Sequence, residues 1–164
     1  MSLPDNIPIF ADTLVGAYSL SAKNTSEVAR NIAGAIAAHF AAATLDGVDI
    51  TLGSNLSATA VEALELRLIE AFSVVDDPEG AAALMELAFL DYLNNGPITD
   101  MWAAAVEATK DGDNLHDVMK VVMSGTITLT SVAATRVSTG LTQWICGSVK
   151  IELDEVPARF VYIV

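Results

Sequence analysis

The stretch that decides the fold reads AIAAHFAAATLDG and covers residues 35–47. Alanine dominates it, and one histidine, His39, lies near its middle. Apolar residues recur through residues 28–43 at the three- and four-residue spacing of a helix. The pattern ends at Gly47, because glycine adopts the left-handed conformation that terminates helices. The stretch therefore predicts a thin, closely packed helix whose apolar face carries one histidine.

His39 has two interpretations, a catalytic base or a packed polar group. A general base needs an orienting partner within hydrogen-bonding distance. The positions one turn away on the helix (35, 36, 42 and 43) are alanine, isoleucine, alanine and alanine. The sequence therefore favours a packed or subunit-interface histidine, which hydrogen-bonds to another element of the fold.

The composition limits the classes of function. A chain of 164 residues has the size of one domain, so we expect a single domain over residues 1–164. Hydrophobic residues make up 52% of it, but many are alanine, which predicts a modest core. The 8 basic residues do not cluster against 21 acidic ones, and the net charge is −13. This balance argues against sequence-nonspecific nucleic-acid binding and against docking on an anionic membrane.

Targeting and anchoring signals are not expected either. The longest apolar run, residues 31–45, is too short to span a bilayer and is interrupted by His39. The N-terminal residues MSLPD have no basic region and no apolar run, so we expect no signal peptide. The one cysteine, Cys146, has no partner for an intramolecular disulfide.

Periodicity predicts an α+β fold. Apolar residues at helical spacing predict about five or six helices, over residues 8–21, 24–46, 57–75, 77–92, 99–109 and 115–122. Alternation with period two predicts strands at residues 126–130, 144–153 and 160–164, with a polar connection at 136–140 and a short strand or loop at 48–52. The expected architecture is a helical part over residues 1–123 followed by a small antiparallel β part over residues 124–164.

The last predicted strand reads FVYIV, residues 160–164, and both of its faces are apolar. Side chains alternate along a strand, so Phe160, Tyr162 and Val164 point to one side and Val161 and Ile163 to the other. A modest core cannot cover both faces. We therefore predict that Phe160, Tyr162 and Val164, together with His39, lie at or near a subunit interface.

Other candidate sites have simpler interpretations. Residues 111–117, DGDNLHD, lack the alternating oxygens and the sixth-position glycine of a calcium loop, and are interpreted as a solvated turn. Cys146, beside Trp144, is interpreted as a structural thiol. The acidic residues of the middle region are interpreted as solvated helix faces and caps: Glu62, Glu65, Glu70, Asp76, Asp77 and Glu79. The sequence predicts no catalytic residue, no metal ligand and no cofactor.

Two segments carry a resemblance. Residues 10–18, FADTLVGAY, followed by residues 36–44, IAAHFAAAT, resemble small virion proteins of tailed bacteriophages, of the neck, head-tail connector or tail-completion type. The likeness covers roughly the first third of the chain. It implies a non-enzymatic structural subunit that assembles with copies of itself, as a ring, and with other virion proteins. It also implies a location in the virion, and in the host cytoplasm during assembly.

The alternative class is a small intracellular enzyme or ligand-binding protein. Its site would be built from scattered residues such as His39, Trp102 and His116. A deep pocket that holds His39 beside a buried carboxylate would favour this alternative. A lack of convergent polar groups would favour the structural subunit.

Overall fold

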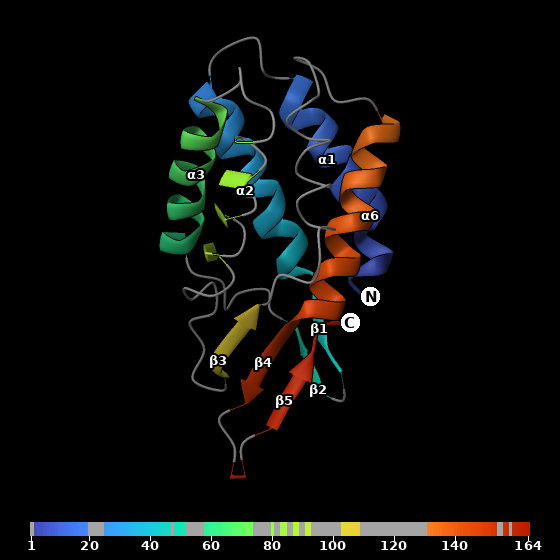
Figure 1. Cartoon of the computed structure of the whole chain (residues 1–164). Coiled ribbons are helices and arrows are strands. Elements are labelled where there is room, and N and C mark those ends of the chain that lie inside the picture. Colours follow the sequence, from blue (N-terminus) through green and yellow to red (C-terminus); the bar gives the residue numbers. More distant parts are fainter. Residues whose placement is uncertain are drawn as a thin grey trace.

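In the computed structural model of this chain, the helices lie side by side in a row, and the antiparallel strands lie below them (Figure 1). The structure describes residues 2–19, 25–46, 48–51, 58–73, 80, 83–84, 87–88, 91–92, 103–108, 131–153, 156–157 and 159–164. Its elements are η1 (Pro4–Asn6), α1 (Ile7–Ser19), α2 (Thr25–Ala41), β1 (Thr44–Leu45), β2 (Val48–Thr51), α3 (Ala58–Phe72), β3 (Ala103–Ala108), α6 (Ser131–Ser148), β4 (Val149–Leu153) and β5 (Arg159–Tyr162). The fold class is α+β, as the sequence predicts.

The helices pack in the order α3, α2, α1, α6 (Figure 1). α2 lies between α1 and α3, so it buries two sides rather than one stripe. Ala29 and Ala33 are fully buried along it, and Phe40 is 1% exposed at its C-terminal end. Alanine lets neighbouring backbones approach closely, while each alanine buries little apolar area. The alanine-rich stretch is therefore the central helix of the row.

The strands form two antiparallel groups that meet at the C-terminus. β4 lies between β3 and β5, and β1 pairs with β2 in a hairpin. An isolated bridge between Leu45 and Ile163 joins β1 to the end of β5. The N–H of Val164 donates to the carbonyl of Thr44 at 3.0 Å, and the N–H of Leu3 donates to the carbonyl of Val164 at 3.0 Å. Ile163 and Val164, which follow β5, thus connect the C-terminus to β1 and to the N-terminal segment at Leu3.

One strand contradicts the predicted helix over residues 99–109. Residues 103–108, AAAVEA, form β3 and pair with β4 in a register from Ala103 opposite Leu153 to Ala108 opposite Val149. Alanine and glutamate favour a helix when isolated. Here the backbone hydrogen bonds of the paired strand outweigh that local preference, because strand formation depends on tertiary context.

The longest helix, α6, contradicts a predicted connection and the first half of a predicted strand. Residues 136–140 and 144–148 both lie within α6, and only residues 149–153 form the expected strand, β4. Trp144 and its neighbour Ile145 are both buried, which an alternating strand does not allow. The buried stripe of α6 also includes Ser138 and Thr142. These polar residues interrupt the apolar repeat from which the sequence would otherwise predict a helix. Helices and strands are therefore interleaved along the chain and not separated at residue 124.

The remaining predicted elements vary in outcome. Within the described residues, the helices predicted over 8–21 and 57–75 are confirmed as α1 and α3. The helix predicted over 24–46 is confirmed as α2 only as far as Ala41, because Thr44 and Leu45 pair with β2 as the strand β1 instead of continuing the helix to Gly47. Of the two alternatives at 48–52, a short strand or a loop, the structure has the strand, β2. The described residues between positions 80 and 92 are helical, in agreement with the predicted helix there. The structure bounds four α-helices within its described residues, fewer than the five or six expected. The predicted helix at 115–122 and strand at 126–130 lie outside the described residues.

Candidate functional site

His39 lies where η1, α1, α2 and α6 meet. Its Nδ1 is 3.0 Å from Nδ2 of Asn6, and its Nε2 is 2.8 Å from Oγ1 of Thr142. The ring of Phe10 stacks on the imidazole, with centroids 4.1 Å apart and an angle of 9° between the planes. Each of the four elements supplies one group of this cluster, and His39 is 2% exposed.

The hydrogen bonds of the cluster assign one tautomer to His39. The hydroxyl of Thr142 donates to the carbonyl of Ser138 at 2.6 Å, because a carbonyl oxygen can only accept. Oγ1 of Thr142 must then accept a hydrogen from Nε2 of His39. Nδ1 therefore carries the lone pair and accepts from the side-chain amide of Asn6. The three bonds form one directed chain, from Asn6 through His39 and Thr142 to a backbone carbonyl of α6.

Burial keeps this imidazole neutral. Desolvation lowers the pKa of His39 from its ordinary value of 6.5 to about 4. A cationic ring would also carry a hydrogen on Nδ1, which faces the amide donor of Asn6. Both the desolvation and the donor arrangement favour the uncharged form near pH 7.

Thr142, His39 and Asn6 follow one another like the nucleophile, the base and the orienting residue of a catalytic triad, but their hydrogen bonds differ from those of a triad. A general base needs a free lone pair directed at the group it deprotonates. Here Nε2 carries a hydrogen, and the lone pair of Nδ1 is occupied by Asn6. The hydroxyl of Thr142 is 1% exposed and already donates to Ser138. The described contacts account for His39 as a packed, hydrogen-bonded histidine.

The partners of His39 lie far from it in sequence, which is why a search within one turn does not find them. Asn6 is 33 residues before it and Thr142 is 103 residues after it. A signal for Thr142 exists in the sequence. Ser138 and Thr142 are four residues apart, and Leu141 beside Thr142 is apolar, which is the spacing of a buried helical stripe. Nothing comparable marks Asn6.

The other candidates of the sequence lie apart from this cluster. Trp102, His116, the loop at residues 111–117, and Asp76, Asp77 and Glu79 are outside the described residues. Glu62 and Glu70 are exposed on α3, and Glu65 pairs with Arg30 of α2 at 3.3 Å. Burial raises the pKa of the Cys146 thiol on α6, which leaves it protonated and unreactive near pH 7. Within the described part of the chain, no three His, Cys, Asp or Glu side chains come together as a metal site.

The strand β5 and the residues after it have one covered and one open face. Val161 and Ile163 are 6% and 0% exposed, whereas Phe160, Tyr162 and Val164 are 45%, 49% and 38% exposed. The register places Lys150 opposite Tyr162 and Glu152 opposite Phe160 on the open side. The ammonium of Lys150 lies over the ring of Phe160, 4.9 Å from its centroid. We call these five side chains the outer face: Lys150, Glu152, Phe160, Tyr162 and Val164.

The predicted interface residues thus divide into two groups. His39 lies inside the chain, and the outer face holds Phe160, Tyr162 and Val164. Among the described helices, none is both long and apolar enough to cross a membrane. No family model, curated protein or solved structure matches this chain.

Proposed function

We propose that this chain is a non-enzymatic structural subunit of a tailed-bacteriophage virion, of the neck, head-tail connector or tail-completion type. In this role it acts through protein–protein contacts, with copies of itself and with other virion proteins. It resides in the virion, and in the host cytoplasm while particles assemble. It needs no cofactor and reads no nucleic-acid sequence.

The observation that carries the proposal is the outer face. Phe160 and Tyr162 on β5, and Val164 just after it, remain between 38% and 49% exposed. Contiguous exposed apolar side chains with charged residues around them mark contact sites on proteins. The face is held firmly, because Val161 and Ile163 behind it are buried in the core. A preorganised apolar surface of this kind binds another protein with little loss of conformational entropy.

The resemblance of the two N-terminal segments supports the virion assignment. Residues 10–18 lie on α1, and most of residues 36–44 lie on α2, the two helices that pack together (Figure 1). The segments therefore belong to one helical pair. A net charge of −13 also suits a subunit that surrounds DNA without binding it, since like charges repel.

The enzyme alternative receives no support from the described residues. It requires His39 to act with groups such as Trp102 and His116. The hydrogen-bonding capacity of His39 is occupied within the chain, and Trp102 and His116 lie outside the described residues.

Mass spectrometry of purified particles tests the proposal directly. Particles of the phage whose genome encodes the chain should contain it in fixed stoichiometry with the portal or tail proteins. The gene should lie beside genes for a portal, a terminase or a tail tube. A chain that is abundant in infected cells but missing from particles purified free of cell debris would contradict the proposal.

A further inference from the structure

A hollow of about 260 Å³ opens between α3 and the helical residues of the segment 80–92. A smaller space of about 40 Å³ adjoins it and shares Arg67, Ala88 and Asp91 with it. The larger hollow is lined by Arg67, Glu70, Leu84, Leu87, Ala88 and Asp91. For comparison, an interior cavity of about 150 Å³ holds benzene. The hollow is therefore large enough to receive an aromatic ring.

The hollow combines an apolar floor with a charged rim. Leu84, Leu87 and Ala88 provide the floor, and Leu87 is 61% exposed. The guanidinium of Arg67 lies 3.5 Å from the carboxylate of Glu70 and 3.8 Å from that of Asp91. The side chains of this rim are 45–63% exposed, so the rim holds both signs of charge at an accessible surface.

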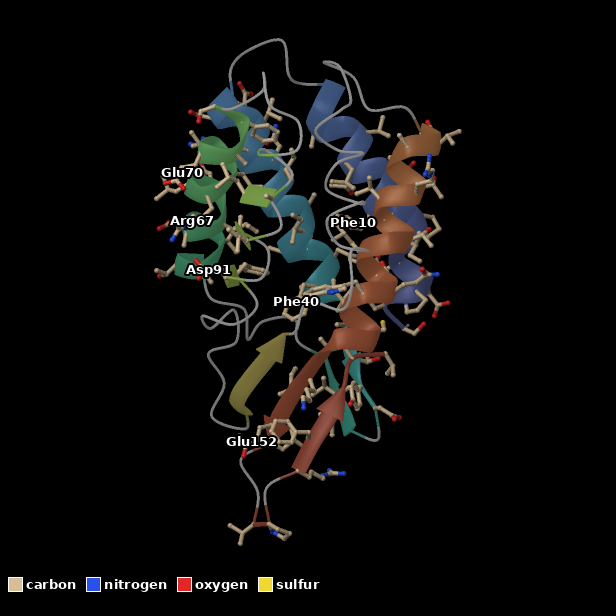
Figure 2. The ribbon with its side chains drawn as sticks, viewed as in Figure 1. Phe10, Phe40, Arg67, Glu70, Asp91 and Glu152 are labelled. Atoms are coloured by element: carbon tan, nitrogen blue, oxygen red, sulfur yellow. The ribbon has the colours of Figure 1, made fainter. Side chains whose placement is uncertain are left out.

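The outer face has the complementary chemistry. It presents the rings of Phe160 and Tyr162 on β5 beside one cation, Lys150, and one anion, Glu152, on β4. Figure 2 places Arg67, Glu70 and Asp91 at the α3 side and Glu152 at the other end of the molecule, on the strands. The two surfaces of one chain therefore cannot meet each other.

We propose that the outer face of one copy docks into the α3 hollow of the next copy. An aromatic ring of the outer face fills the apolar floor, Lys150 meets Glu70, and Glu152 meets Arg67. Two chains with a net charge of −13 repel each other, so a contact between copies needs a place where both signs match locally. The hollow and the outer face provide such a place.

This contact joins two different surfaces and is therefore heterologous. Such a contact repeats from copy to copy, and it closes as a ring or continues as a filament according to the rotation between copies. The inference rests on the proposed function, because it specifies how the subunits associate with each other. It makes no use of the other virion proteins.

Engineered cysteines test the geometry of the contact. Leu87→Cys and Tyr162→Cys are placed in separate copies that carry Cys146→Ser, mixed at high protein concentration and oxidised. We expect a disulfide-linked dimer from this mixture. Val132→Cys mixed with Tyr162→Cys is the matched control, because Val132 is 73% exposed on α6 and belongs to neither surface. Equal yields from the two mixtures would overturn the inference.

A charge exchange tests the chemistry of the same contact. Lys150→Glu and Glu70→Lys should each weaken self-association about tenfold, and the two together should restore much of it. Glu62→Lys is the control, because Glu62 is exposed on α3 but does not line the hollow. Sedimentation velocity gives the association constants, and circular dichroism verifies that each variant folds. Lack of rescue in the double variant would contradict the pairing.

The two proposals fail separately. If particles contain the chain but the Leu87–Tyr162 pair links no better than the control, this contact is wrong and the structural role stands. If the pair links and the charges rescue, but particles lack the chain, the contact stands and the virion role is wrong.

Discussion

The imidazole of His39 and the hydroxyl of Thr142 lie 2.8 Å apart, although 103 residues separate them in the chain. Both residues are at most 2% exposed. The bond connects α2, in the middle of the helical row, directly to α6 at its edge. With Asn6 on the other ring nitrogen, one side chain holds three elements in register. This makes His39 the most informative position for mutation in the interior.

Substitution of His39 should separate hydrogen bonding from packing. We expect His39→Ala to lower the free energy of unfolding by about 1–3 kcal/mol, because it leaves the buried groups of Asn6 and Thr142 without their partner. His39→Gln should cost less and should preserve assembly, since an amide both donates and accepts. Urea denaturation at pH 7 measures both values. Equal losses in the two variants would indicate that the hydrogen bonds contribute nothing.

The stability contributed by His39 should depend on pH in one direction. The unfolded chain binds a proton at the ordinary pKa of 6.5, while burial lowers the pKa of folded His39 to about 4. Between these values the unfolded state binds more protons, so stability is complete above pH 6.5 and is lost as the pH falls toward 4. At 1.36 kcal/mol per pKa unit, the loss amounts to about 3 kcal/mol at most.

The control for this titration is His39→Gln, because it keeps every carboxylate of the chain. The partners Asn6, Phe10 and Thr142 are uncharged, so the difference between the parent and the variant isolates the imidazole. Urea denaturation at intervals from pH 7.5 to 4.5 gives this difference. As the pH falls, the parent should lose more free energy of unfolding than the His39→Gln variant does. A difference that stays constant across the range would show that His39 is not desolvated.

The two faces of β5 should respond differently to a polar residue. Ile163→Ser removes a fully buried side chain and should destabilise the fold by about 3 kcal/mol. Tyr162→Ser acts on the 49% exposed side and should leave the fold nearly unchanged while it reduces self-association. Thermal denaturation and light scattering over a range of concentrations distinguish the two effects. A large loss of stability from Tyr162→Ser would assign the outer face to the core of the single chain.

Removal of residues 160–164 should combine both effects. The deletion takes away the buried Val161 and Ile163 and the Val164 carbonyl that accepts from Leu3 and Thr44. We therefore expect aggregation or loss of assembly. Light scattering of the truncated chain beside the full chain measures this outcome. A truncated chain that folds equally well would remove the structural role of the strand.

Gly34 offers a substitution that should stabilise the chain. It lies in the middle of α2 on an exposed position, and a Cβ there would meet no described atom within 4 Å. Alanine restricts the unfolded chain and favours the helix, so Gly34→Ala should raise the free energy of unfolding by about 0.5–1 kcal/mol. Thermal denaturation verifies the increase. A decrease would mean that another surface covers this side of α2.

The sequence by itself determined the class of the fold and the elements with strong local signals. The first three helices and the C-terminal strand follow from apolar periodicity, whereas the sequence leaves residues 48–52 open between a strand and a loop. The alternation of residues 160–164 also determined which side chains share a face. These features depend on neighbours a few positions away, which the sequence displays directly.

Tertiary structure alone decided the other assignments. Residues 103–108, AAAVEA, form a strand because they pair with β4, although alanine and glutamate favour a helix in isolation. Residues 131–148 became a helix whose buried stripe includes Thr142, since its hydroxyl finds partners in the Ser138 carbonyl and in His39. His39 found Asn6 and Thr142 across 33 and 103 residues. Such partners are set by how the helices pack, and packing is a property of distances in space that the order of the residues does not express.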